Sequence, residues 1–198
     1  TIKDANAVER KVTSFNAIQI QNGIDLYLTQ GNEEAVAVSA SETEYRNKII
    51  TEVVNGTLKI YYKHEDGIQM SWGNKKLKAY VSFKAIDKLH ESSGADVVLK
   101  STVTVNKLQC TLTSGSRFTG QVDIGEMEVS QNSGSEIEIS GKTDRLQVEV
   151  SSGAIFQGYD MADDFYEATA SIVGAVRITF NKDLNAHATM ASELLYKG

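Results

Sequence analysis

Three stretches of the chain share one pattern: LQCTLTSG at 108–115, MEVSQNSG at 127–134 and LQVEVSSG at 146–153. Each alternates apolar with polar residues and ends in a small polar residue followed by glycine. They recur about every 19 residues, and a repeat this short cannot bury its own apolar face. Alternation with many Thr, Val and Ser favours strands over helices. We therefore predict short strands wound into stacked coils, which is a β-solenoid.

Steps of about 19 residues reach a large apolar residue in every coil of the C-terminal half. We predict that these side chains form one inward-facing column: Leu89, Leu108, Met127, Leu146, Phe165 and Leu184. A corner between two strands needs backbone angles that glycine adopts freely. The predicted corner residues are Gly94, Gly115, Gly134 and Gly153, with Gly174 in the fifth copy and Ala191 in the last.

QNGIDLYL at 21–28 has the same pattern as SSGADVVL at 92–99. We expect Gly23 to lie at the same corner as Gly94, with Leu26 and Leu28 matching Val97 and Leu99. The solenoid then begins near the N-terminus, and residues 41–75 are an insertion between coils.

The insertion is predicted to contain a helix and a hairpin. Ser41 and Glu44 have the spacing of a capping box, so we expect a short helix within 41–56, ended by Asn55-Gly56. TLKIYYKH at 57–64 and KKLKAYVSF at 75–83 are predicted strands, joined by a loop.

Composition excludes several classes of protein. The chain has 198 residues, a net charge of -6, no proline and one cysteine. No long basic stretch is present, which argues against nucleic acid as a partner. Cys110 has no partner for a disulfide, and its alternating surroundings predict a core residue. No apolar run reaches the roughly 20 residues of a membrane span. The sequence contains no signal peptide, and its first residues look like a mature or trimmed terminus.

Several motifs together resemble a bacterial family, the putative auto-transporter adhesins with a head GIN domain. They are FNAIQIQNGIDLYLTQG at 15–31, VVNGTLKI at 53–60, the serial Ser-Gly repeats and the terminal Tyr196-Lys197-Gly198. The Gly-Ile-Asn motif falls on Gly23, Ile24 and Asp25, with aspartate in place of asparagine. The resemblance runs from about residue 13 to the end of the chain.

The resemblance implies a right-handed, single-stranded parallel β-helix similar to pectin-lyase-like folds. It also implies export to the periplasm, the outer-membrane surface or the extracellular space, and it supplies no catalytic residues or cofactor. We expect an N-terminal extension at 1–12 and one head GIN-type β-helix domain at 13–198. Within that domain, 13–85 holds the first coil or coils with the insertion, and 86–198 holds the regular coils.

Two groups of residues are candidate binding sites. Outward positions of successive coils predict a polar column that suits a glycan or a protein, although any solvated sheet face has such a column: Gln109, Glu128, Gln147, Tyr166 and Asn185. Trp72 lies in a predicted loop and is a second candidate for stacking on a sugar or anchoring a partner, while a tryptophan that closes a hairpin over the core fits the sequence equally well.

Acidic residues gather near one predicted turn: Asp144, Asp160, Asp163, Asp164 and Asp183. The simplest interpretation is a solvated acidic turn. Converging carboxylates also suit Ca²⁺, or the acid pair of a polysaccharide-cleaving enzyme. A serine hydrolase is not supported, because no G-x-S-x-G elbow exists and the three histidines are scattered.

The leading hypothesis is a non-enzymatic envelope or surface protein that binds a glycan or a protein partner. The first alternative is a β-helix enzyme that cleaves polysaccharides with the acidic turn. The second is a structural module that oligomerises through the open ends of the solenoid, since unpaired strand edges recruit partners.

Overall fold

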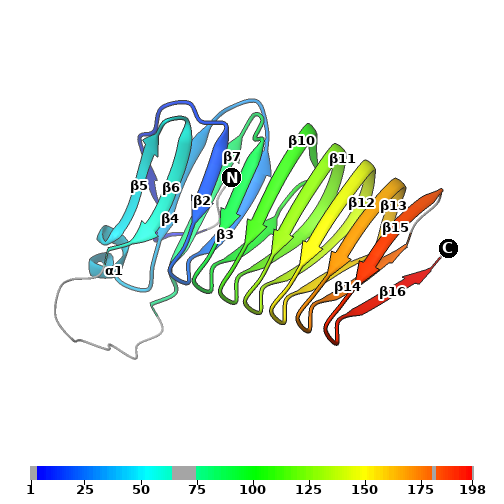
Figure 1. Cartoon of the computed structure of the whole chain (residues 1–198). Helices are drawn as coiled ribbons and strands as arrows, with labels where there is room; N and C mark the ends of the chain where they lie inside the picture. The colour runs from blue at the N-terminus through cyan, green and yellow to red at the C-terminus, as the bar shows by residue number, and fades with distance from the viewer. Residues whose placement is uncertain (1–3, 64–74, 180–181, 198) are drawn as a thin grey trace.

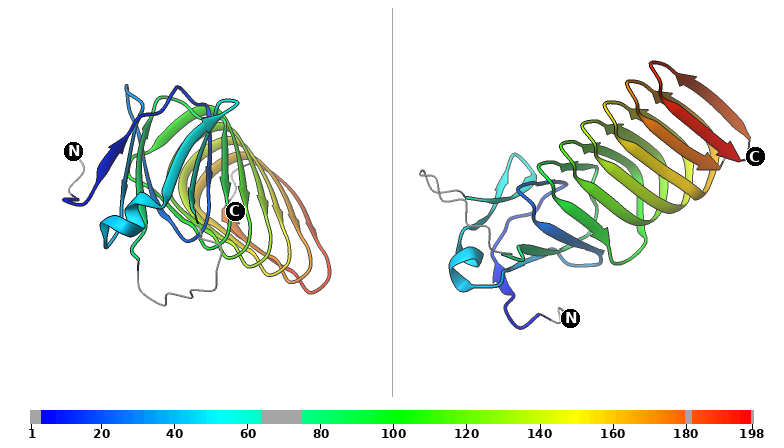
Figure 2. Two further views of the ribbon diagram at one scale, coloured as in Figure 1. Left: turned by 90° about the vertical axis from the view of Figure 1, so that its left-hand side faces the viewer. Right: turned by 90° about the horizontal axis from the view of Figure 1, so that it is seen from below.

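The computed structural model describes residues 4–63, 75–179 and 182–197 (Figure 1). Trp72 and His64 therefore lie outside the described residues. The strands stack along one axis as successive coils, with the chain advancing from the N-terminal to the C-terminal end (Figures 1 and 2). The elements are β1 Val8–Arg10, β2 Ala17–Ile20, β3 Asp25–Gln30, β4 Ala35–Ser39, α1 Thr43–Asn47, β5 Ile49–Val54, β6 Thr57–Tyr62, β7 Lys78–Phe83, β8 Lys88–Glu91, β9 Asp96–Leu99, β10 Val103–Leu112, β11 Arg117–Gln131, β12 Glu136–Val150, β13 Ile155–Ala170, β14 Ala175–Thr179, β15 Asp183–Ala188 and β16 Glu193–Lys197.

The predicted parallel β-helix is confirmed by the strand pairing. Strands β10 to β13 pair in parallel with the equivalent strand of the next coil, and each bends from one face of the solenoid to the next. Leu108 lies opposite Met127, and Met127 lies opposite Leu146. All three are buried, so the centre of the predicted inward column is correct.

Two members of that column, Leu89 and Phe165, are wrong. Leu89 lies opposite Cys110, two residues beyond Leu108. Between β12 and β13 the register shifts by one residue, so that Tyr166, and not Phe165, lies opposite Leu146. The cause is an extra residue in β13, which is how a β-bulge breaks a regular pattern. Leu184 is predicted correctly: it lies opposite Tyr166, in the column of Leu146, because the next coil is shorter by one residue.

A pair of left-handed residues forms the corner of each coil. Ser114 has a φ of 57° and Gly115 a φ of 71°, and no atom would contact a Cβ placed on Gly115. Glycine is therefore favoured there by the backbone angle and not by crowding. The corners are hydrogen-bonded to one another, since the Gly94 amide donates to the Ser114 carbonyl and the Gly115 amide to the Ser133 carbonyl, both at 3.0 Å.

The last two corners have no glycine in the left-handed pair. Ile172 and Val173 form one, with φ of 49° and 63°, and Met190 and Ala191 form the other. The extra residue in β13 moves Gly174 one place past the corner, so its predicted position was wrong. Left-handed angles crowd a β-branched side chain against its own backbone.

The match between QNGIDLYL and SSGADVVL is confirmed. Leu26 of β3 lies opposite Val97 of β9, and Leu28 lies opposite Leu99. The Gly23 amide donates to the Ser93 carbonyl at 3.0 Å, which continues the row of corners into the first coil.

The predicted insertion differs in detail. Helix α1 is limited to Thr43–Asn47 and follows Glu42, with no side-chain cap from Ser41. Residues Ile49–Val54 form β5, an antiparallel partner of β6, and Asn55-Gly56 makes the tight turn between them with φ of 50° and 76°. Asn-Gly is the preferred sequence for such a hairpin turn, and Ile and Val favour strands. These two preferences outweigh the helix-like spacing of the apolar residues, so the segment forms a hairpin. Strands β6 and β7 were expected to form a hairpin but pair with different partners.

Among the described residues, one carboxyl group is buried in the core. Glu91 of β8 points inward between Ile20 and Leu112, is 0% exposed, and neither of its side-chain oxygens has a hydrogen-bond partner. Burial, followed by the nearby charge of Asp96, raises the pKa of Glu91 well above its usual value of 4.5. Burial therefore favours the neutral form of this carboxyl group in the folded protein.

Replacing Glu91 with glutamine is expected to flatten the pH dependence of stability. The unfolded chain releases this proton near pH 4.5, whereas the folded chain keeps it to a higher pH. The wild-type free energy of unfolding should therefore fall as pH rises above 4.5, and E91Q should lack that part of the fall. Urea unfolding at a series of pH values measures both slopes. Equal slopes would contradict a buried neutral carboxyl group.

The corners predict two substitutions of opposite effect. Gly134→Val forces a β-branched residue to a φ of 71° and should cost about 1–2 kcal/mol. Val173→Asn places a residue that tolerates left-handed angles where valine is 64% exposed, and should add up to about 1 kcal/mol. Thermal unfolding of both variants checks the signs. A loss in V173N would show that the Ile172–Val173 corner is not strained.

Candidate functional site

Four outward-facing residues form a row across the N-terminal end of the solenoid. Tyr27 of β3 lies opposite Tyr80 of β7, Tyr80 opposite Ala37 of β4, and Ala37 opposite Glu9 of β1. Strands β3 and β4 precede the insertion and β7 follows it. Strand β1 pairs antiparallel with β4 and forms the edge of the sheet. Side chains far apart in the sequence are therefore neighbours here.

The two tyrosines make a fixed aromatic stack. Their ring centroids are 5.3 Å apart and the ring planes differ by 17°. The Tyr80 hydroxyl donates a hydrogen bond of 2.7 Å to the Asp4 carboxylate. Lys100 lies 5.8 Å from the centre of the Tyr27 ring. One face of the pair is thus occupied by a lysine, and the hydroxyl of the other ring is held in place.

Ionisation at the stack follows from these contacts. Burial, with the hydrogen bond to Asp4 as the next cause, raises the pKa of Tyr80 above its usual value of 10. The same hydrogen bond lowers the pKa of Asp4 below 3.8. At neutral pH the pair is therefore a phenol that donates to a carboxylate, which fixes the direction of the bond.

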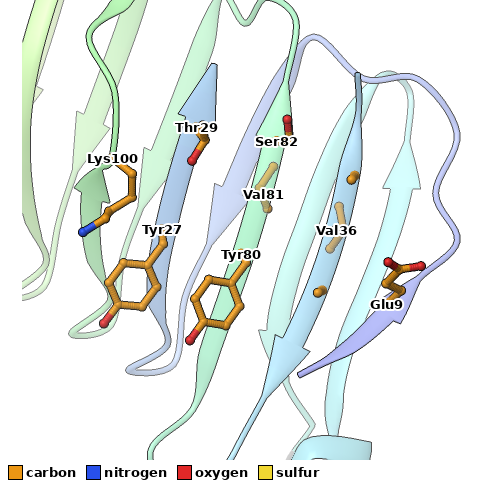
Figure 3. Close-up of a pocket in the computed structure, with 10 residues that line it drawn as sticks. Glu9, Tyr27, Thr29, Val36, Tyr80, Val81, Ser82 and Lys100 are labelled. Carbon is orange, nitrogen blue, oxygen red and sulfur yellow. The ribbon is translucent and has the colours of Figure 1, made fainter. Parts of the chain in front are cut away.

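A groove of about 630 Å³ lies beside the stack (Figure 3). The two alanines of β4, Ala35 and Ala37, form its low floor between Tyr80 and Glu9. Strand spacing puts the backbones of β7 and β1 about 10 Å apart. Of the two alanines between them, Ala35 is exposed and Ala37 is 3% exposed, so the open part of the floor is at Ala35. The groove is lined by Glu9, Tyr27, Thr29, Ala35, Val36, Ala37, Tyr80, Val81, Ser82 and Lys100.

The groove combines an aromatic wall, a carboxylate and hydroxyl groups. A sugar ring has apolar C–H faces that pack on an aromatic ring, and hydroxyls at its edge that donate to a carboxylate. Pockets that fix small ligands generally pair an apolar surface with a few such polar groups. The arrangement therefore suits one pyranose ring or a short oligosaccharide.

The predicted polar column lies on another face of the solenoid. Gln109, Glu128 and Gln147 are neighbours in register and line a shallow groove of about 280 Å³. The Gln109 amide donates to Glu128 at 2.6 Å, so part of the column's hydrogen-bonding capacity is used internally. Asn185 lies in the column, opposite Glu167.

Tyr166 does not belong to the polar column. It is 0% exposed and points into the core, and Glu167 takes the outward place opposite Gln147. The register shift in β13 that displaced Phe165 is again the cause.

The acidic turn is more dispersed than predicted. Asp183 lies opposite Phe165 and not beside Asp164, and Asp160 lies opposite Ser140. Asp144 is exposed at a hollow of about 710 Å³ that also contains Lys107, Glu126 and Arg145. Lys107 is 3.7 Å from Glu126, and the Arg145 guanidinium lies 4.7 Å from the centre of the Phe165 ring.

Over the described ranges, no group of three histidine, cysteine, aspartate or glutamate side chains is placed to hold a metal ion. The side chains of Asp163 and Asp164 lie outside the described residues. The calcium site stays a prediction without a described set of ligands.

The Gly-Ile-Asp motif adjoins the aromatic stack. Gly23 forms the corner, Ile24 is buried, and Asp25 faces outward two residues before Tyr27. Asp25 lies opposite Asp96, and partial burial followed by repulsion from Asp96 raises the pKa of Asp25. The motif thus starts the strand that carries Tyr27.

Comparison with known proteins now gives the family. Residues 14–198 match the family described as "Putative auto-transporter adhesin, head GIN domain". The chain belongs to this family. No curated protein matches this head GIN domain.

Solved structures of similar shape include proteins of Bacteroides and Parabacteroides species. A putative adhesin of Bacteroides fragilis has a TM-score of 0.83 at 13% identity, covering 99% of this head GIN domain and 98% of that chain. A putative adhesin of Parabacteroides merdae has a TM-score of 0.71 at 13% identity, covering 97% and 95%. A putative lipid binding protein of Parabacteroides distasonis has a TM-score of 0.67 at 16% identity, covering 97% and 96%. These identities are low, so the likeness concerns the fold alone.

Sequence reasoning missed the aromatic groove. Tyr27 and Tyr80 are each outward residues of a strand, in LYL and AYV, but nothing in their spacing predicts that β3 and β7 pair across the insertion. The only signal was that both tyrosines occupy the polar phase of an alternating strand.

Replacing Tyr80 with phenylalanine should loosen the N-terminal segment while keeping the stack. The lost bond to Asp4 should cost roughly 0.5–1 kcal/mol, since Asp4 is largely solvated. Because that bond lowers the pKa of Asp4, the cost should be present above pH 3.8 and disappear below it. Thermal unfolding of Y80F at two pH values tests this, with Y61F as the control for a tyrosine bonded to the exposed Glu52. An equal loss at both pH values would contradict the assignment.

Proposed function

We propose that this head GIN domain is a non-enzymatic binding protein of the bacterial envelope or cell surface. We further propose that it binds a glycan by stacking a sugar ring on Tyr80. The observation that carries the proposal is the alanine-floored groove between Tyr80 and Glu9. Membership of a family named for adhesins supports the surface role. None of the described helices is long and apolar enough to cross a membrane.

The geometry favours a glycan over an apolar chain. The groove lies on the outer surface of the sheet, and its aromatic wall is fixed before any ligand arrives. Preorganised stacking reduces the entropy lost on binding. The Glu9 carboxylate and the Thr29 hydroxyl supply hydrogen-bonding groups, which a lipid tail would leave unpaired, whereas the Ser82 hydroxyl already donates to the Glu33 carbonyl at 2.8 Å.

The enzymatic alternative has weaker support. A polysaccharide-cleaving site would need two carboxylates on either side of a sugar in a groove. The hollow at Asp144 holds two exposed carboxylates, but its Lys107 is paired with Glu126 and its Arg145 packs on Phe165. The solved structures of similar fold include a putative adhesin and a putative lipid binding protein, and neither name is that of an enzyme.

A printed array of neutral and acidic oligosaccharides, probed with and without calcium, tests the proposal. We expect wild-type protein to bind a defined subset in both conditions. Titration calorimetry with the strongest-binding oligosaccharide should then show at least a tenfold loss of affinity in Y80A. This variant lacks the stacking surface, which contributes about 1–3 kcal/mol to the binding free energy. Ala35→Trp should cause a similar loss by filling the groove, without removing any ligand contact.

Two matched controls locate the site. Tyr61→Ala removes an outward tyrosine outside the groove, and Thr111→Trp adds a tryptophan beside the polar column. Both should bind as wild type does. Binding that survives Y80A and A35W but is lost in T111W would assign the glycan to the polar column instead. Absence of binding to every oligosaccharide would overturn the proposed function.

A further inference from the structure

The last coil of the solenoid exposes the end of its core. Inward residues of β15 and β16 continue columns that are fully buried one coil earlier: Leu184 lies opposite Tyr166, Leu194 opposite Val176, and Tyr196 opposite Ile178. Tyr166, Val176 and Ile178 are 0% exposed, whereas Tyr196 is 61% exposed. At the other end, β5, β6 and α1 lie against the first coil, and the inward residues there are mostly buried (Figure 2).

Both terminal strands have one hydrogen-bonded neighbour each among the described strands. β16 pairs with β14, and β15 pairs with β13. Their outer edges therefore present backbone N–H and C=O groups to a further strand. β16 also carries exposed apolar side chains, with Leu195 at 42% and Tyr196 at 61%.

The sequence of β16, Glu-Leu-Leu-Tyr-Lys, is complementary to itself when reversed. In an antiparallel pair of two copies centred on Leu195, Glu193 of each copy faces Lys197 of the other. Leu194 then faces Tyr196, on the side of the sheet that continues the core. Glu193, Leu195 and Lys197 alternate onto the outward face, so the opposite charges meet on one side of the ladder.

We infer that two copies of this chain join end to end through β16, in an antiparallel pair with a twofold axis at Leu195. The exposed inward side chains of the two last coils, Leu184, Leu194 and Tyr196, then close one continuous core. A twofold contact uses the same surface on both copies, so the assembly stops at a dimer and does not grow into a fibre.

The existing contacts of the two charged residues are compatible with this pairing. Glu193 lies 3.4 Å from Arg177, and Lys197 lies 4.7 Å from the centre of the Tyr159 ring. Both partners are on the same copy and lie toward the preceding coil, which leaves the outer edge of β16 available. Exposed ion pairs contribute little stability but select the partner and the register.

Sedimentation velocity on protein from which an N-terminal purification tag has been removed, from low to several hundred micromolar, tests the inference. Wild type should change from a 21.6 kDa monomer to a species of twice that mass. Glu193→Lys and Lys197→Glu should each weaken self-association at least tenfold, since each places like charges opposite one another. Glu33→Lys, an equal change in charge on an exposed loop, should not.

Mixing the two weakened variants gives the decisive result. A copy with E193K presents two lysines and a copy with K197E presents two glutamates, so only the mixed dimer has opposite charges at both pairs. Native mass spectrometry should show a one-to-one heterodimer at concentrations where each variant alone is monomeric. Wild type that stays monomeric throughout, or variants that dimerise unchanged, would overturn the inference. A mixture that fails to associate would exclude the antiparallel register.

Discussion

The corner of each coil controls where every outward side chain of this protein lies. Two left-handed residues turn the chain between faces, and the amide of the second donates to the corner carbonyl of the next coil. A slip of one residue at a corner would exchange inward and outward side chains along the following strand. The Tyr27–Tyr80 stack depends on this, because Tyr27 stands four residues after Gly23 and faces outward only in the observed register.

The solenoid could be predicted because most of its repeats carry the residue types that a left-handed corner favours. Ser-Gly recurs where φ is positive, and alternation separates inward from outward residues between Leu108 and Val150. The prediction fails where one residue is added within a strand. The added residue lies at Tyr159 in β13. The sequence around it gives no sign of the addition, because the next coil is one residue shorter and the average length of the two coils stays the same. Tyr166 was therefore assigned to the surface although it is a core residue.

The candidate site was harder to predict than the fold, for a topological reason. Its wall and floor come from strands separated by the insertion, and their pairing is set by long-range contacts. Local propensity correctly predicted a strand at β7. It was wrong at β5, where a helix was predicted, because Asn55-Gly56 closes a hairpin and does not end a helix. The predicted polar column does exist, but its residues were chosen by period alone. Period describes the surface of any coil and does not distinguish a groove from a solvated face.

The groove and the dimerisation edge lie at opposite ends of the solenoid, and this arrangement has a consequence for binding. The groove lies on β3, β7, β4 and β1, next to the N-terminal end, whereas β16 forms the C-terminal end (Figure 1). A twofold pair through β16 therefore directs its two grooves away from each other, at the far ends of the rod. One groove that holds a single sugar ring binds weakly, since small contacts must overcome the entropy of association. Two grooves on a rigid rod engage a surface that displays many copies of the same glycan, and the second contact forms at a high effective concentration. Weak recognition of one ring and firm attachment to a dense surface are then compatible properties of the same protein.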